Sequence, residues 1–461
     1  MSKGFQKQIS IFFAISSMIF LIFGNTAIAE TWDVYPAMTR AEIQAVVDSA
    51  SDGDSIYFHA GTYDWSSAPL TKRGDNEGAI NIIDKSLIIK GELDTLIVGR
   101  ESVDPTGDDP EGVNAFYVVD LNLDNDVTFD GLNFQTFLRV INAAYLIIPP
   151  GEHYIAEPNA RNITVKNCTF TDIHRDAVSL SNVRGNILIQ NNEMSTGRMG
   201  MFIDWWWSEN HEDWQPDDSH VQILGNKINS VRRGVYLAMT TNVVVQQNTI
   251  ICEGWGIDNR YARKGTVISN NSLFDCMRGI FILGRWRYGI RHEAEGAVIE
   301  GNKLIDISYF GIYIAGDASF GHTVSKNEIH MAPGSRVGIY TVAHDCYYGQ
   351  NKISGSGRFA FLLDWWNYIP DGGYFVYAHH ITLQANNVSQ FSPYYCHFYL
   401  YYGTHDNLVV GSGIGHNTYI DVGYNNRITG VTPMAGGIGQ DLSEAVKERN
   451  EELKEARIIQ N

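Results

Sequence analysis

Residues 221–237, VQILGNKINSVRRGVYL, and residues 243–257, VVVQQNTIICEGWGI, repeat one phrase. In both stretches, a hydrophobic-x-x-Asn-x-hydrophobic segment is followed a few residues later by a Gly and an apolar residue. The phrase recurs along the chain at Asn192, Asn226, Asn248, Asn271, Asn302, Asn327, Asn351 and Asn386, and at Gly200, Gly234, Gly256, Gly279, Gly311 and Gly338. The shortest spacing between these glycines is 22 residues. A repeat of this length indicates a solenoid, in which each unit buries its apolar face by stacking on its neighbours.

The repeat assigns a structural role to most of its residues. Each coil of such a solenoid contributes short strands to parallel sheets, in which neighbouring strands lie about 4.8 Å apart. An Asn that recurs at the same turn can form a ladder of stacked amides, so we expect the asparagines to be structural. Strand side chains alternate between two faces, which places the residues one and three positions after each Gly inside the coil. These residues are Met201, Ile203, Val235, Leu237, Ile280, Ile282, Ile312 and Ile314.

Both ends of the repeat region have helical patterns. Residues 39–50, TRAEIQAVVDSA, predict a short amphipathic helix, in which Thr39 and Glu42 form a capping box. Such a helix would cover the open end of the first coil, which otherwise exposes unpaired backbone. Residues 441–461 are highly charged and predict a short C-terminal helix.

The opening helix, GDSIYFHAGTY at residues 53–63, KSLIIKGE at residues 85–92 and the Asn/Gly repeats carry a family resemblance. Together they resemble the right-handed parallel β-helix proteins of the pectate-lyase-like superfamily, over roughly residues 30–430. The resemblance implies an all-β fold: a right-handed, single-stranded parallel β-helix over residues 30–440, with an N-terminal capping helix. That superfamily includes polysaccharide lyases, glycoside hydrolases, epimerases, phage tailspikes and adhesins, so fold does not decide the reaction.

The composition and the N-terminal residues limit where the protein can be located and which partners it can bind. Residues 1–29 are typical of a secretory signal, with Lys3 and Lys7 before an apolar stretch and Ala27-Ile28-Ala29 as a cleavage site. We therefore expect a secreted or periplasmic protein that makes no membrane contact after cleavage. The formal net charge of −18 argues against general nucleic-acid binding, although a local basic strip can still bind an anion.

The cysteines do not indicate a metal site. None of the five has a zinc-binding spacing. Cys252 and Cys276 fall at nearly equivalent places in adjacent repeats, where they could form a disulfide or remain buried thiols.

Outward positions of the repeat gather aromatic and charged residues. If the repeat Gly is position zero, position +2 holds Phe202, Tyr236, Asp258, Phe281, Tyr313 and Tyr340. Position −2 holds Arg198, Arg232 and Arg336, and related coils add Arg175 and Arg358. Position +4 holds Asp204, Arg260 and Asp364. We expect all three rows on one face, where flat aromatic rings suit sugar rings and arginine forks suit carboxylates or sulfates. The aromatic rings could also simply stack on one another, and the arginines could pair with neighbouring acids.

Three insertions leave the same strand ends and are rich in Trp. They lie at about residues 204–220, with Trp205 and Trp206, at about residues 284–297, with Arg285 and Trp286, and after Asp364, with Trp365. Exposed Trp clusters usually mark binding surfaces. We therefore expect these loops to form the walls of a ligand groove.

Residues 254–264, GWGIDNRYARK, form the segment most suited to chemistry. Asp258 and Arg260 face outward from one strand, and Arg263 and Lys264 follow. This coil lies between two large insertions. A local ion pair between Asp258 and Arg260 fits the pattern as well as catalysis does.

The first functional hypothesis is a lyase or epimerase that acts on a uronate-containing polysaccharide. Such a reaction needs a group that neutralises the carboxylate, a base for the C5 proton and, for cleavage, an acid for the leaving oxygen. The arginines supply the first, and Lys264, desolvated among arginines, would be the base. The resemblance also permits Arg260 as the base and a calcium ion held by acidic residues, with Asp204 and Asp258 as its candidate ligands. No organic cofactor is expected.

Two alternatives stay open. An inverting glycoside hydrolase needs two carboxylates roughly 6.5–9.5 Å apart. Asp258 is about 9.6 Å from either Asp204 or Asp317, which each lie two coils away. A non-catalytic glycan-binding or surface protein would use the same aromatic and arginine rows.

Overall fold

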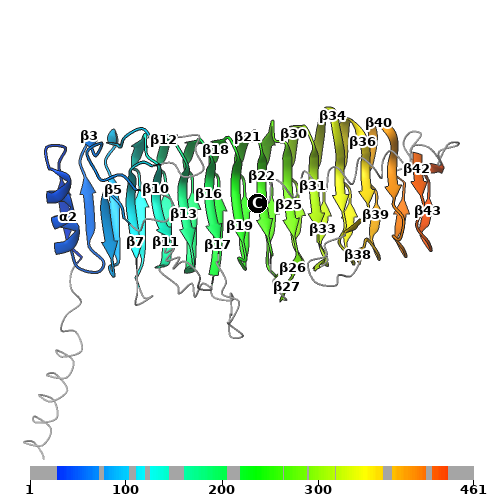
Figure 1. Ribbon diagram of the computed structural model, residues 1–461, viewed down its shortest axis with the longest axis horizontal. Helices are drawn as coiled ribbons and strands as arrows, with labels where there is room; N and C mark the ends of the chain where they lie inside the picture. The colour runs from blue at the N-terminus through cyan, green and yellow to red at the C-terminus, as the bar shows by residue number, and fades with distance from the viewer. Residues whose placement is uncertain are drawn as a thin grey trace, which may run out of the picture.

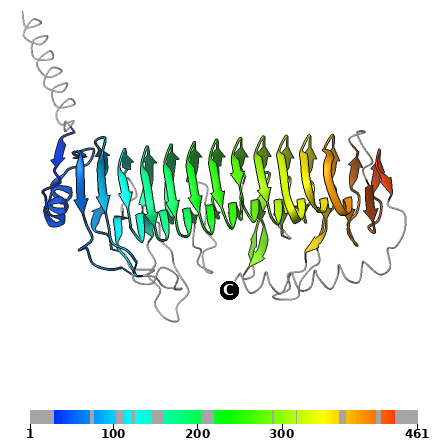
Figure 2. The same ribbon diagram turned by 90° about the horizontal axis from the view of Figure 1, so that it is seen from above.

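The computed structural model describes residues 29–71, 77–102, 111–119, 125–144, 160–204, 219–262, 264–287, 290–316, 318–366, 376–411 and 418–433. Within these ranges the chain is built of strands and a single helix, α2 (Arg40–Ser49). The strands stack coil upon coil along one long axis, with α2 at the N-terminal end (Figure 1). Viewed from above, the same column of strands carries short hairpins on one side (Figure 2). The predicted all-β parallel β-helix is confirmed.

One face of the solenoid is a 15-stranded sheet in which each strand pairs in parallel with the next. Its strands in stacking order are β1 (Thr31–Val34), β2 (Ser55–Phe58), β5 (Leu87–Gly91), β8 (Val127–Asp130), β11 (Ala160–Lys166), β14 (Val183–Gln190), β17 (Ser219–Leu224), β20 (Val243–Gln246), β23 (Val267–Ser269), β29 (Val298–Glu300), β33 (Thr323–Ser325), β35 (Tyr347–Gly349), β39 (Thr382–Gln384), β41 (Leu408–Val410) and β43 (Arg427–Thr429). We call it the first stack.

The other two faces belong to one 23-stranded sheet. Its second stack consists of β3 (Gly61–Asp64), β6 (Thr95–Val98), β9 (Asn133–Gln135), β12 (Thr169–Ile173), β15 (Glu193–Thr196), β18 (Lys227–Ser230), β21 (Thr249–Cys252), β24 (Ser272–Phe274) and β30 (Lys303–Ile307). Its third stack consists of β4 (Ile80–Ile83), β7 (Asn114–Val119), β10 (Arg139–Ala144), β13 (Asp176–Ser181), β16 (Met199–Asp204), β19 (Arg233–Ala238), β22 (Trp255–Arg260), β25 (Arg278–Leu283), β31 (Phe310–Ala315), β42 (Thr418–Asp421) and β44 (Thr432–Pro433). Long strands that belong to both stacks join them: β34 (Glu328–Thr341), β36 (Lys352–Leu363) and β40 (Asn387–Leu400).

Short strand pairs lie outside these stacks. β26 (Arg285–Arg287) and β27 (Ile290–His292) form an antiparallel hairpin after β25, and β37 (Trp365–Trp366) and β38 (Val376–Tyr377) form another after β36. β28 (Ala294–Glu295) pairs in parallel with β32 (Ser319–Phe320). Both hairpins therefore leave the C-terminal ends of third-stack strands, as the sequence predicted for the insertions.

The repeat asparagines form a continuous ladder inside the coil. The backbone N and the side-chain Nδ2 of Asn192 donate to Asn226 Oδ1 at 3.0 and 2.9 Å. The same two bonds link each repeat Asn to the next as far as Asn386. All eight side chains are buried. An unpaired buried amide costs about 1–3 kcal/mol, so the ladder explains why Asn recurs, as predicted.

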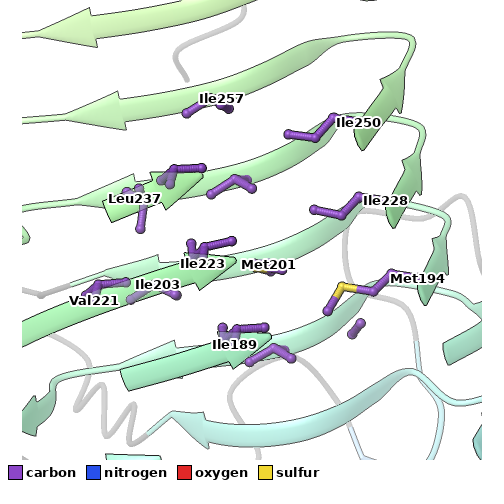
Figure 3. Packing of buried hydrophobic residues seen from close by; sticks show 14 of the residues in the cluster. Ile189, Met194, Met201, Ile203, Val221, Ile223, Ile228, Leu237, Ile250 and Ile257 are labelled. Carbon is purple, nitrogen blue, oxygen red and sulfur yellow. The ribbon is translucent and has the colours of Figure 1, made fainter. Parts of the chain in front are cut away.

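Aliphatic side chains fill the interior in stacked rows. Met201, Val235, Ile257 and Ile280 occupy one position on successive strands of the third stack and are 0–1% exposed. Figure 3 shows members of this row beside inward residues of the other stacks, such as Ile223 and Ile250. The predicted inward positions are confirmed.

The repeat Gly interrupts the alternation of side chains. A Cβ at Gly200 would lie 2.5 Å from Ile228 Cγ2 and 2.7 Å from the Gly234 carbonyl oxygen, so position zero faces the interior. The residue after it also faces inward: Val140 and Ile141, at positions zero and +1 of β10, are both fully buried. Two consecutive inward residues shift the outward position before the Gly from −2 to −1. The −2 arginines therefore do not form an outward row of the strand itself, but Arg175 and Arg198 still reach Asp176 on the sheet face, and Arg336 and Arg358 line a pocket there.

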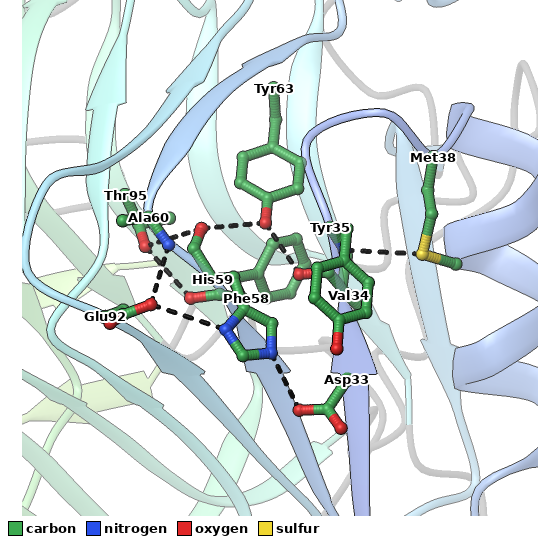
Figure 4. Close-up of polar contacts among 10 residues, drawn as sticks. All are labelled: Asp33, Val34, Tyr35, Met38, Phe58, His59, Ala60, Tyr63, Glu92 and Thr95. Atoms are coloured by element: carbon green, nitrogen blue, oxygen red, sulfur yellow. Dashed lines mark hydrogen bonds and ion pairs between the residues drawn. The ribbon is translucent and has the colours of Figure 1, made fainter.

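The first coils are tied together by α2 and by polar contacts. The predicted capping box is present, because the Thr39 hydroxyl accepts from Glu42 N at 3.3 Å and the Glu42 carboxylate accepts from Thr39 N at 2.7 Å. Ile43 and Val47 of α2 are buried. In the next coils, His59 lies between Asp33, at 2.9 Å, and Glu92, at 3.4 Å (Figure 4).

Several predicted segments lie outside the described residues. These are the signal sequence up to residue 28, the tail at 441–461 and residues 205–218 of the first insertion. No helix among the described residues has the length and apolarity that a membrane crossing requires. All five cysteines are described as buried free thiols, and the sulfurs of Cys252 and Cys276 lie 3.0 Å apart.

Candidate functional site

The outward surface of the third stack, which we call the site face, carries two rows of side chains. The +2 row follows the predicted order from strand to strand: Ser179, Phe202, Tyr236, Asp258, Phe281, Tyr313, Tyr340, Leu362 and Tyr399. The −1 row beside it contains Arg139, Asp176, Met199, Arg233, Trp255, Arg278, Phe310, Val337 and Phe359. The face therefore has charged residues in its N-terminal half and aromatic residues in its C-terminal half.

Asp258 is the centre of the charged half and is fully enclosed. Its Oδ2 lies 2.8 Å from Arg233 Nε, and its Oδ1 accepts from Arg260 Nε at 3.1 Å. Arg260 Nη2 also donates to Oδ2 at 3.3 Å. Asp258 is 0% exposed, while the two guanidinium groups reach toward the surface. One carboxylate thus holds two arginines in place.

Asp176 repeats this arrangement nearer the N-terminus. Its Oδ2 lies 3.3 Å from Arg175 Nε, 3.4 Å from Arg198 Nη1 and 3.6 Å from Arg139 Nε, and Asp176 is 1% exposed. The two carboxylates together face five guanidinium groups, so among the described residues of this half the arginines outnumber the acids that they face. We call Arg139, Arg175, Asp176, Arg198, Arg233, Asp258, Arg260 and Arg278 the arginine region.

Aromatic rings support the arginines. Arg278 lies over Trp255, with 4.1 Å between its guanidinium carbon and the ring centroid. Arg233 and Arg260 lie over Tyr236 at 5.0 and 5.6 Å. Cation–π contacts at such distances fix a guanidinium plane without using its N–H donors, so the donors can still bind a ligand.

Burial and neighbouring charges shift the pKa values in this region. Burial lowers the pKa of Arg233 and of Arg278. Burial also lowers the pKa of Arg260, but the charges of Asp258 and Tyr236 outweigh it and leave the pKa above its usual value. Burial raises the pKa of Tyr236 to about 12. Arg260 is therefore held in its protonated form, which favours carboxylate binding and weakens the hypothesis that it acts as a base.

The aromatic half of the site face contains a pocket of about 60 Å³, which we call the tyrosine pocket. Tyr340 and Asp364 lie in it, joined by a hydrogen bond of 2.8 Å from the phenol to Asp364 Oδ2. Its other lining residues are Phe310, Arg336, Val337, Arg358, Phe359, Leu362, Tyr395, Tyr399 and Tyr401. The predicted substrate-binding residues Tyr340 and Arg336 thus meet here.

The other residues predicted for the site lie at the edge of the site face, in the aromatic row or outside the described residues. Tyr313 stacks on Tyr340 at 4.5 Å, and Arg232 is exposed at the edge of the site face. Lys264 is also exposed, in the turn after β22, so the burial on which its role as a base depended is absent. Arg263, Trp205 and Trp206 lie outside the described residues, as do the side chains of Arg285, Trp286 and Trp365.

The surroundings of Asp204 and Asp258 do not suit calcium. Asp258 faces two guanidinium groups, which repel a cation, and Asp204 Oδ1 accepts a hydrogen bond from Ser181 at 2.7 Å. Asp204 is only 5% exposed. Since Asp258 is fully buried and ion-paired with two arginines, the pair of Asp204 and Asp258 also does not fit the two carboxylates that a hydrolase needs. Asp317 lies outside the described residues.

Sequence reasoning missed Arg139, Asp176, Arg233, Trp255 and Arg278, which all occupy the −1 row. A signal for them was present, because Arg232 and Arg233 are adjacent and only one of them can lie on the sheet face. Strict alternation across the Gly favours Arg232, whereas the two consecutive inward residues place Arg233 on the face.

Comparisons with known proteins agree with the fold. The family described as "Right handed beta helix region" matches residues 155–285, and no curated protein sequence matches the chain. Among solved structures, the A-module of the mannuronan C-5 epimerase AlgE6 from Azotobacter vinelandii is 15% identical. It has a TM-score of 0.48, with 88% of this chain and 100% of that chain covered.

A mannuronic acid-specific polysaccharide family 6 lyase from human gut microbiota is 14% identical, with a TM-score of 0.38 and 91% and 94% of the two chains covered. The catalytic domain of a GH87 α-1,3-glucanase is 11% identical, with a TM-score of 0.38 and 89% and 67% covered. By its strand topology this chain is a parallel β-helix, and its residues 155–285 match the right-handed type.

Proposed function

We propose that this protein is a secreted, carbohydrate-active protein that binds an anionic, uronate-containing polysaccharide along the site face and acts on it as a lyase or epimerase. The observation that carries the proposal is the arginine region. Five arginines face two buried carboxylates there, and Arg278 lies beside them on Trp255. These arginines outnumber the two carboxylates that they face.

The chemistry of the region suits a row of sugar carboxylates. A guanidinium fork binds a carboxylate through two parallel hydrogen bonds. The rings of Tyr236 and Trp255 offer flat apolar surfaces of the kind that pack against sugar rings. The protein carries a formal net charge of −18, so an anionic polymer would be repelled from most of its surface. This repulsion directs the polymer to the one basic strip.

Uronate lyases and C5-epimerases share their first requirement. Both remove the proton at C5, which becomes more acidic when cations neutralise the adjacent carboxylate. Arg260 suits the binding of a carboxylate along the polymer because its ion pair with Asp258 keeps it protonated. The arginine region thus supplies carboxylate binding in this proposal, and the proton must be removed by another group.

The test is incubation of the full chain in D₂O with a panel of uronate polymers and one neutral glucan. A lyase produces ultraviolet-absorbing unsaturated ends, and an epimerase incorporates deuterium at C5 without them. Reducing ends that form without that absorbance, or binding without turnover, would support a hydrolase or a binding protein instead. Equal binding of the neutral and acidic polymers would contradict the assignment of an anionic ligand.

A further inference from the structure

The tyrosine pocket contains a carboxylate that is enclosed differently from Asp258. Asp364 follows directly after β36, at the point where the chain leaves the site face for the β37–β38 hairpin. Its backbone is fixed on both sides, since Asp364 N donates to Thr341 O at 3.1 Å and Asp364 O accepts from Ala378 N at 2.9 Å. Its side chain is 2% exposed, yet it lines the pocket.

A tyrosine hydroxyl is positioned on this carboxylate. The Tyr340 hydroxyl donates to Asp364 Oδ2 at 2.8 Å. The ring of Tyr340 is held by Tyr313, with centroids 4.5 Å apart and planes 8° apart, and by Phe310 at 5.3 Å. The neighbouring rings thus hold the Tyr340 hydroxyl against Asp364, so the pair is a preorganised acid–base couple.

The pocket has both charge and space for a ligand. Arg336 and Arg358 are partly exposed at its edge, and Arg336 lies 4.3 Å from the centroid of Tyr309. A single water needs about 10–15 Å³, so a pocket of about 60 Å³ accommodates several ligand atoms. Arginines beside a buried Tyr–Asp couple would bring a uronate carboxylate close to proton-transfer groups.

The pocket and the arginine region are within reach of one polymer. Asp258 and Tyr340 both belong to the +2 row, separated by the strands of Phe281 and Tyr313. Three strand spacings amount to about 14 Å. A polysaccharide that lies along the solenoid axis would therefore span both sites.

We infer that Tyr340 and Asp364 are the proton-transfer couple for the processing of an acidic glycan bound across Arg336 and Arg358. This inference rests on the proposed function and deepens it. The Asp364 carboxylate accepts the C5 proton, and the C5–H electron pair forms the C4–C5 double bond. The C4–O bond breaks and the leaving oxygen takes the phenolic proton of Tyr340. Asp364 then returns the proton to the Tyr340 phenolate through their hydrogen bond, which restores both groups.

The test compares Tyr340→Phe and Asp364→Asn with the unaltered full chain on the most active uronate polymer of the panel. A positioned acid or base contributes about 10²–10⁴-fold to rate, so we expect a loss of kcat of this order in each variant. Both variants keep the shape of the pocket. Their affinity for the polymer, measured by calorimetry, should therefore change by less than about threefold, since no charge that binds a carboxylate is removed.

Tyr348→Phe is the matched control. The buried Tyr348 hydroxyl donates to Thr341 Oγ1 at 2.7 Å. Thr341 is the residue that follows Tyr340 in the chain. This variant loses a buried tyrosine hydrogen bond of similar length, so it should lose stability and keep its kcat. If Tyr340→Phe and Asp364→Asn turn over at the unaltered rate, the couple is not catalytic, although the proposed function stands. If the unaltered protein processes no acidic polymer, both proposals are overturned.

Discussion

The arginine region and the tyrosine pocket lie on the same face of the same stack, yet they surround their carboxylates with opposite chemistry. Asp258 is fully buried against Arg233 and Arg260, which use its oxygens as a fixed counter-charge. Asp364 meets a neutral tyrosine hydroxyl in a pocket. One repeat scaffold therefore produces a charge-holding acid at one end and a proton-exchanging acid at the other.

The difference follows from position within the repeat. Asp258 occupies the +2 row, where the −1 residue Arg233 of the preceding coil and the +4 residue Arg260 of its own strand close over it. Asp364 occupies position +4, at the end of the strand, where the chain departs and leaves space. A carboxylate in the middle of a strand is thus enclosed, whereas a carboxylate at the end of a strand can reach a ligand.

The largest expected effect is the loss of stability in Asp258→Asn. Breaking a buried ion pair by neutralising one partner costs about 3–5 kcal/mol, because the remaining charge is left uncompensated. Here Arg233 and Arg260 would both be left without their carboxylate. Urea unfolding of Asp258→Asn should show this loss. Asp364→Asn weakens the hydrogen bond from Tyr340 and should cost about 1–3 kcal/mol.

Equal losses in the two variants would contradict the comparison, because they would mean that Asp364 also carries a structural charge. A smaller loss in Asp258→Asn than in Asp364→Asn would contradict the assignment of Asp258 as a fixed counter-charge.

The fold could be predicted from sequence because its determinants are local and periodic. The Asn ladder requires the same residue on each coil, and the inward apolar positions require the same spacing, so both are visible without coordinates. The +2 row was also predicted correctly, because alternation holds from the residue after the Gly onward.

The candidate site was predicted only in part, because it depends on contacts that spacing does not reveal. Gly200 and its equivalents place two consecutive residues inside the coil, which moved the outward row from Arg232 to Arg233. Enclosure of Asp258 depends on side chains of three coils. The Tyr340–Asp364 bond joins position +2 of one coil to position +4 of the next. A comparison of equivalent positions in successive coils does not predict a contact between two different positions.

An intermediate effect is expected when Arg278 is replaced by Ala. Its guanidinium lies over Trp255 and has no carboxylate within ion-pair distance among the described residues. We therefore expect it to bind ligand rather than protein. Loss of one hydrogen bond to a charged group weakens binding about tenfold, or about 1.4 kcal/mol. Calorimetric titration with an acidic oligosaccharide measures this change, which should shrink at high salt.

Arg161→Ala is the control for charge alone. Arg161 is an exposed arginine of β11 in the first stack, away from the site face. Its removal lowers the positive charge of the protein by the same amount and should leave affinity unchanged. Equal weakening by both variants would show that the polymer responds to total charge rather than to the arginine region.

The smallest expected effect is a difference between the two regions in how their local stability depends on pH. Beside the coils of the tyrosine pocket, the rings of His344, His379 and His405 stack 4.8 and 4.9 Å apart. The other titratable groups that face this stack are His322, His380, Asp345 and Asp406. Burial, followed by the neighbouring histidines, lowers the pKa of His379 to about 4. The unfolded chain therefore binds a proton here more readily than the folded one.

It follows that the contribution of His379 to stability is complete above its ordinary pKa of about 6.5 and is lost as the pH falls toward 4. Because the ring is partly exposed, we expect only a roughly threefold drop in amide protection factors of β35, β39 and β41 between about pH 7.5 and 5. The strands β17 and β20, which are the first-stack strands of coils that carry the arginine region, and the third-stack strand β22 should keep theirs. His379→Phe retains a ring in the stack without its titration, so the drop should diminish in this variant. An unchanged drop would show that the carboxylates, rather than the imidazole, respond to pH.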